Sequence, residues 1–250
     1  SNASQKTTTQ MVRVAYRALA SNTNERTLVS TVIPAGFPTG DSLNVCPLPP
    51  THALMIASIM SSFVMDWIIR NKVTTNVNMF YIEQLPMVDY LQDQDRSPLI
   101  RTAIVARACR LVCTSEHFGD IWAKCYEDYW TKAEFWYPSK RDIDYGPTHE
   151  QEIRSRLASE AVELSPVWRD ECGVGKVSTL GSGDWRRRQL LSEIDAYVAH
   201  LYRLSREQFE YILNTFPVLA NREERSLGEH IAMRKCLEEY DRIGRVLGNE

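Results

Sequence analysis

MVRVAYRALASNTNERTLVSTVIP (11–34) and THALMIASIMSSFVMDWIIRNKV (51–73) together predict the core of the fold. From Val12 to Leu19 the residues alternate between the two faces expected of a half-buried strand. Residues 27–33 are rich in β-branched side chains and predict a second strand, which ends before Pro34. The polar residues 21–26 between them predict the tip of a β-hairpin.

Residues 51–71 predict one helix, with Thr51 as its N-cap. Its apolar residues cover more than one face, so we expect protein to surround it on most sides. The most apolar part, 53–69, is at the short limit for crossing a bilayer and contains Asp66 and three serines. These features favour a buried core helix, and no membrane partner is predicted.

The rest of the chain is predicted to be mostly helical. A short strand at 43–46, and a loop with a short strand at 76–85, complete the N-terminal part. The predicted helices that follow span residues 98–114, 117–131, 150–164, 185–202, 205–216 and 221–247. We therefore expect an α+β fold, in which a small sheet packs on a buried helix and a mostly helical C-terminal part follows. The predicted boundaries are 1–10 for a tag remnant or disordered segment, 11–90 for the α+β part and 91–250 for the helical part.

Composition indicates a soluble, cytoplasmic protein. The 250 residues are 44% hydrophobic and 24% charged, and the sequence shows no secretory signal. Six cysteines form no CxxC pair, which is typical of reduced thiols in the cytoplasm. The net charge of −3 divides into +1 for residues 1–90 and −4 for the remainder, so the acidity lies in the C-terminal part. This distribution permits nucleic-acid contact by the N-terminal part without demanding it.

Sequence motifs for catalysis are missing from the chain. It has no Gly-rich loop suited to S-adenosylmethionine and no Asn-Pro-Pro-aromatic motif that would grip a flipped adenine. The GVGK segment at 173–176 lacks the spacing of a phosphate loop. The histidines at 52, 149, 200 and 230 have no serine or cysteine partner in a recognisable arrangement. We therefore predict no catalytic residue.

Cys109, Cys113 and His117 repeat every four residues and could line one helical face as metal ligands. Only three such residues are present, and Cys109 has apolar neighbours. Soft core residues explain the pattern better, so no metal site is predicted.

The basic run Arg186-Arg187-Arg188 begins a predicted helix, where cations oppose the helix macrodipole. Something else must therefore favour it. Three interpretations stay open: contact with a phosphate, a solvated face, or pairing with Glu193 and Asp195.

Two stretches resemble parts of known enzymes. RVAYRALASNTNERTLVSTVIP (13–34), the apolar helix and NVNMFYIEQLP (76–86) are similar to the last third of the target-recognition domain in type IIG restriction-modification adenine methyltransferases and related phage-defence methylases. LSREQFEYILNTFPVLANREERSLGEHIAMRKCLEEYDRI (204–243) is similar to the C-terminal tail of the same enzymes. The resemblance implies a full-length parent that methylates adenine N6 with S-adenosylmethionine, bound in a catalytic domain that this chain lacks. It leaves open whether the parent also cleaves DNA.

The resemblance thus makes this chain a non-catalytic target-recognition fragment, with double-stranded DNA and the parent's methylase domain as partners. Arginine and asparagine side chains match guanine and adenine edges, and basic side chains also bind phosphates. The candidate nucleic-acid-binding residues are Arg13, Arg17, Asn22, Asn24, Arg26, Thr27, Arg70, Lys72 and Asn76. We expect the arginines to meet phosphate or guanine, the asparagines base edges, and Thr27 phosphate. The alternative is a docking or scaffold module of the same system that does not contact bases.

Overall fold

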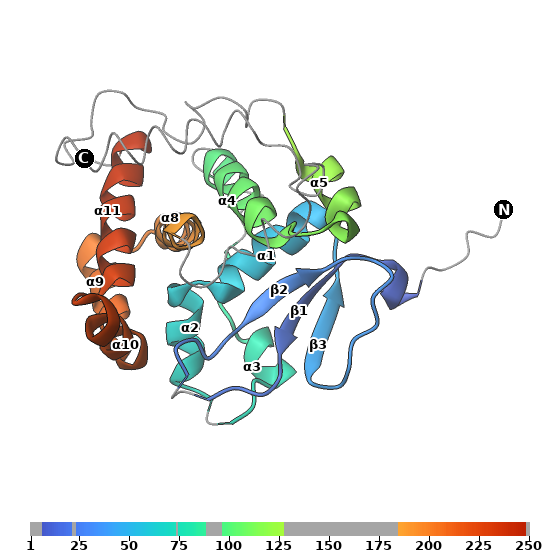
Figure 1. Ribbon diagram of the computed structural model, residues 1–250, viewed down its shortest axis with the longest axis horizontal. Coiled ribbons are helices and arrows are strands. Elements are labelled where there is room, and N and C mark those ends of the chain that lie inside the picture. Colours follow the sequence, from blue (N-terminus) through green and yellow to red (C-terminus); the bar gives the residue numbers. More distant parts are fainter. Residues whose placement is uncertain (1–6, 22–23, 74, 89–96, 128–184, 249–250) are drawn as a thin grey trace.

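The computed structural model describes residues 7–21, 24–73, 75–88, 97–127 and 185–248 of the chain. These residues form the α+β fold that the sequence predicts, with a small sheet on one side and layers of helices beyond it (Figure 1). The strands are β1 (Arg13–Arg17), β2 (Ser30–Ile33) and β3 (Leu43–Pro47). The helices are η1 (Thr8–Gln10), α1 (Pro50–Ser61), α2 (Phe63–Arg70), α3 (Met79–Glu83), α4 (Ser97–Val112), η2 (Glu116–Phe118), α5 (Gly119–Cys125), α8 (Trp185–Leu201), α9 (Arg206–Asn214), α10 (Pro217–Leu227) and α11 (Ile231–Val246). The helix predicted at 150–164 lies outside the described residues.

The sheet is antiparallel with the order β2-β1-β3, so the first predicted strand is its centre. Val14 of β1 lies opposite Val32 of β2 and Cys46 of β3. The predicted pairing of the first two strands and the short strand at 43–46 are therefore confirmed. β2 begins at Ser30 rather than Thr27, because the amides of Thr27 and Leu28 bond to a side chain of α2 instead of a strand.

The prediction of one unbroken helix over 51–71 is wrong. The helix breaks at Ser62, whose hydroxyl accepts a bond from the Met65 amide (3.3 Å) and donates to the Ile59 carbonyl (2.7 Å). Ser62 thus caps α2, and the axes of α1 and α2 meet at 57°. The start of the helix also differs, since α1 begins at Pro50 and Thr51 is not its N-cap. Proline suits the first turn, where its missing N–H would have no helical partner.

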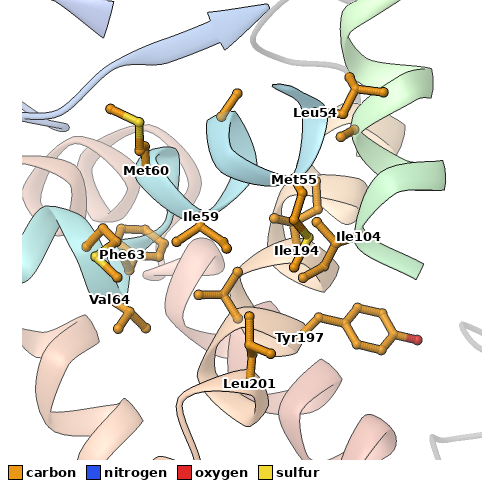
Figure 2. Packing of buried hydrophobic residues seen from close by; sticks show 14 of the residues in the cluster. Leu54, Met55, Ile59, Met60, Phe63, Val64, Ile104, Ile194, Tyr197 and Leu201 are labelled. Carbon is orange, nitrogen blue, oxygen red and sulfur yellow. The ribbon is translucent and has the colours of Figure 1, made fainter. Parts of the chain in front are cut away.

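Helix α1 lies at the centre of the core, as the sequence predicts. It contacts β1 and β2 on one side and α2, α4, α5 and α8 on the others. Its buried residues are Ala53, Leu54, Met55, Ala57, Ser58, Ile59 and Met60. Figure 2 shows Met55 of α1 beside Ile104 of α4 and Ile194 of α8. Burying each large apolar side chain stabilises the fold by roughly 1.5–3 kcal/mol. Because these side chains contact both the sheet and the C-terminal helices, α1 holds the two together.

Within the described residues, no single helix has the length and hydropathy needed to span a bilayer. α1 and α2 reach those values only when they are taken together, and they form a bent pair. Most residues of both helices are buried inside the protein.

Residues 76–85 differ from the predicted loop and strand. Asn76 makes a single β-bridge with Leu19, and the chain then turns into the short helix α3. The bridge is extended by two backbone bonds, from the Ala20 amide to the Thr75 carbonyl (3.0 Å) and from the Val77 amide to the Ala18 carbonyl (2.8 Å). Residues 18–20 and 75–77 therefore run side by side, and we call this contact the bridge seam.

Two further predictions need correction. The single helix predicted at 221–247 is two helices, because Gly228 adopts a left-handed conformation (φ 80°) that ends α10. Residues 8–10 of the predicted disordered segment form the turn η1, and the Thr9 carbonyl accepts a bond from the Gly36 amide. By contrast, the predicted capping box is confirmed: the Ser205 hydroxyl accepts from the Gln208 amide, and the Gln208 side chain accepts from the Ser205 amide.

The central place of α1 can be tested with two identical changes in that helix. Ile59 is fully buried, whereas Ile56 is only partly buried against the core. Ile59→Ala is expected to lower the free energy of unfolding by about 2–5 kcal/mol, because it leaves a cavity that the packed neighbours cannot fill. Ile56→Ala should cost clearly less, and equal costs in urea unfolding would contradict this packing.

Candidate nucleic-acid interface

Arg13 and Arg17 begin and end β1 and point to the same side of it, but their surroundings differ. Arg13 is only 2% exposed, and its guanidinium donates to the carbonyls of Pro34 and Phe37. It therefore ties the segment after β2 to the central strand and has no surface to offer DNA. This burial argues against the predicted DNA contact of Arg13, which stays a prediction. Arg17 is exposed and stays a candidate.

Asp66 organises the chain between the hairpin tip and β2. Its carboxylate, fully buried in α2, accepts bonds from the amides of Thr27 (2.9 and 3.1 Å) and Leu28 (2.7 Å). Burial raises the pKa of Asp66, while the Arg26 charge and these amides oppose the rise. Thr27 itself is fully buried, and its hydroxyl bonds to the Ser21 carbonyl. The burial of Thr27 therefore argues against its predicted phosphate contact, which stays a prediction.

Arg26 is used inside the protein. Its guanidinium lies over the Phe63 ring, 3.2 Å from the centroid, and donates to the Ser61 carbonyl (3.2 Å) and to Asp195 (3.1 Å). Asp195 belongs to α8 and also accepts from the Phe63 amide (2.7 Å). Burial raises the pKa of Asp195, and the Arg26 charge opposes that rise. Arg26 therefore links the hairpin, the junction of α1 with α2, and α8.

Arg70 makes a second tie of the same kind. It donates to the carbonyls of Thr215 (3.0 Å) and Asn24 (3.1 Å), and it lies 4.0 Å from the centroid of the Phe216 ring. Its side chain is 9% exposed, so it is not available to a duplex in this arrangement. Arg26 and Arg70 thus hold the N-terminal sheet against the C-terminal helices, and these internal contacts argue against the predicted DNA contacts, which stay predictions.

The exposed candidates gather at the bridge seam. Arg17 lies just before it, Asn76 is part of it, and both are exposed. Lys72 is exposed three residues before it, and its ammonium bonds to the Gln84 side chain (3.4 Å). Asn24 is half-buried, with its carbonyl engaged by Arg70. Asn22 lies outside the described residues. Arg17, Lys72 and Asn76 therefore form the candidate interface.

The sequence analysis did not identify the side chains that contact Arg26 and Arg70 inside the protein. Asp195, Phe63 and Phe216 come from three separate segments. The Phe63 and Phe216 rings pack edge-to-face, with their centroids 4.7 Å apart. One signal was present: Asp66 is a charged residue within an apolar run, and buried charges need partners. The identity of those partners depends on tertiary packing, which periodicity does not reveal.

The residues considered as metal ligands or catalytic histidines have other neighbours in the structure. Cys109 and Cys113 lie close together (Sγ–Sγ 3.5 Å), but His117 packs against the Phe37 ring. No group of three or more potential metal ligands is found among the described residues. His200 stacks on the Tyr240 ring, and its Nε2 lies 2.9 Å from the Tyr240 carbonyl. These residues therefore have structural neighbours that account for them.

Comparison with known proteins gave no match to the chain among protein-family models, curated proteins or solved structures.

The internal role of Arg26 can be measured against an exposed arginine. Arg26→Ala is expected to lower the free energy of unfolding by about 3–5 kcal/mol, because it leaves the Asp195 carboxylate buried without its charged partner. Arg206, paired with Glu210 and Asp241 at the surface, is the control. Arg206→Ala should cost at most about 1 kcal/mol. Equal costs in urea unfolding would show that the Arg26 pair is no more than a surface pair.

Proposed function

We propose that this chain is a non-catalytic DNA target-recognition part of a restriction-modification methyltransferase that modifies adenine N6. The observation that carries the proposal is the joining of the two stretches that resemble such enzymes. Arg70 of the first stretch donates to the Thr215 carbonyl of the second, and Phe63 packs on Phe216. Segments far apart in the sequence therefore act as one rigid support, which DNA-reading side chains require.

The bridge seam is the surface proposed to meet the duplex. Arg17 and Lys72 are exposed cations at or near it, suited to backbone phosphates, and Asn76, which is also exposed, can form paired bonds with an adenine edge. The backbone bonds of the seam hold the segments that carry Arg17 and Asn76 side by side. Methyl transfer and S-adenosylmethionine binding would belong to another domain of the parent, and this chain would hold the DNA in register for it.

The proposal predicts a salt-dependent affinity that resides at the seam. Fluorescence anisotropy with a duplex over a range of salt concentrations measures how many phosphates the protein neutralises. Arg17→Ala/Lys72→Ala should reduce the slope of log K against log salt by about 2, because two phosphate contacts are lost.

The control removes the same charge elsewhere. Lys124 in α5 and Arg245 in α11 are exposed cations away from the seam. Lys124→Ala/Arg245→Ala should leave the slope close to that of the wild type. Equal slopes for both double variants, or no salt-dependent binding by the wild type, would refute the proposed DNA interface.

A second function, docking onto the methylase domain, is favoured by exposed apolar side chains near the seam. Leu19, Met79 and Phe80 are 62%, 48% and 63% exposed. Leu19 belongs to the bridge with Asn76, and α3, which carries the other two, follows that bridge directly. Large apolar side chains grouped at a surface are typical of protein contacts.

Docking predicts a different result from DNA reading. Leu19→Ser/Phe80→Ser is expected to weaken binding to the parent's methylase domain by about tenfold or more in isothermal titration calorimetry, since such anchors carry much of an interface's energy. Val218→Ser/Leu227→Ser, which changes two exposed apolar residues of α10, is the control and should leave the affinity unchanged. Equal affinities for both variants would exclude docking through Leu19 and Phe80.

A further inference from the structure

A cavity of about 210 Å³ lies where the hairpin and α2 meet α8, α10 and α11. This volume is far larger than the roughly 10–15 Å³ that one water needs, so a small group can enter. Its charged lining consists of Arg26, Arg187, Arg188, Arg222, Glu25 and Asp195. The cavity thus joins residues from both stretches that resemble methyltransferases with the basic run that begins α8.

Positive charge exceeds negative charge in this cavity. Arg26 pairs with Asp195, Arg222 with Glu25, and Arg188 with Glu223 of α10. Three of the four lining arginines are therefore paired, two with carboxylates of the lining and one with Glu223 outside it, which leaves one positive charge in surplus. A surplus of one sign in a recessed site attracts ions of the opposite sign.

Arg187 is the cation in surplus. The two acids that the sequence offered to the basic run are engaged elsewhere, because Glu193 pairs with Arg107 and Asp195 with Arg26. No ion pair of Arg187 is found in the part of the chain that the structure describes. Pairing with Glu193 and Asp195 therefore does not explain this arginine. Arg187 and Arg188 are half-buried rather than on a fully solvated face, so the phosphate interpretation of the run gains support.

Arg222 can also turn to a ligand. Its pair with Glu25 is open to solvent, with side chains 54% and 33% exposed, so it holds the guanidinium only weakly. The cavity is also bordered by the first turns of α8 and α10, through Arg187 and Leu219. The N-cap of α10, Phe216, provides no side-chain bond to the first amides of that helix. Helix starts carry partial positive charge, which adds to that of the arginines.

We propose that this cavity binds a phosphate group, with Arg187 and Arg222 as its ligands. Arginine forks match phosphate oxygens in pairs, which makes two of them sufficient to hold the group. Arg26 and Arg188, fixed by their carboxylates, form the positive wall behind it. A phosphate of the DNA backbone is the source if the proposed function holds, and free phosphate is the other source of the same chemistry.

The first test uses inorganic phosphate and the whole chain. At phosphate concentrations tenfold above the dissociation constant, the melting temperature should rise by about 3–6 °C over chloride of equal ionic strength. Arg187→Ala/Arg222→Ala should lose this rise. Arg225→Ala/Arg245→Ala removes two exposed cations of α10 and α11 that do not line the cavity, and it should keep the rise.

The second test uses the same variants with a DNA duplex. If a backbone phosphate occupies the cavity, Arg187→Ala/Arg222→Ala should lower the salt slope by about 2, and the control should not. A phosphate effect with an unchanged slope supports the site with free phosphate as its source, even if the chain binds no DNA. A lowered slope alone supports it with DNA as the source. If neither quantity differs between the two variants, the site is refuted, whereas DNA binding through Arg17 and Lys72 can still stand.

Discussion

The fold depends on satisfying backbone amides that leave the sheet before β2 begins. Thr27 and Leu28 lie in the core without a strand partner, and the buried carboxylate of Asp66 accepts bonds from both amides. Such a carboxylate is costly to bury unless cations and donors surround it, and Arg26 and Arg70 lie close enough to oppose the rise in its pKa. Arg26 also bonds to Asp195, and Arg70 to the Thr215 carbonyl. The arginines that offset the buried Asp66 charge therefore also join the N-terminal part to the C-terminal helices.

This use of arginine changes where the function is to be sought. Residues at the hairpin tip have side chains suited to DNA. Arg26 and Arg70, however, bond to groups inside the protein, and Arg13 is buried. Arg26 and Arg70 hold together a framework that presents two sites at the surface: the bridge seam beside Arg17, and the cavity lined by Arg187. Both sites lie on segments that Arg26 and Arg70 help to hold in place, so the loss of either arginine is expected to shift both sites without any change to their own side chains.

The sequence is informative where a pattern reflects one element. Alternation located β1, the apolar run located the central helix, and the Ser205–Gln208 spacing located the start of α9. It fails where side chains decide between alternatives. The hydroxyl of Ser62 caps a second helix inside an apolar run, a break that hydrophobic periodicity does not reveal. At the candidate site, exposure separates Arg17 from Arg13 on one strand face, and only packing sets that difference.

Hydrogen–deuterium exchange of the chain, measured with and without a saturating DNA duplex, shows whether the duplex binds at the bridge seam or at the buried contacts around Asp66. We predict slower amide exchange at residues 17–20 and 75–77 on DNA binding, because the proposed interface lies there. Exchange at residues 27–28 and 64–70 should stay unchanged, because Thr27, Leu28 and most of α2 are buried and do not line the proposed interface. Slower exchange at 27–28 and 64–70, with none at the seam, would show that the duplex does not bind at the seam.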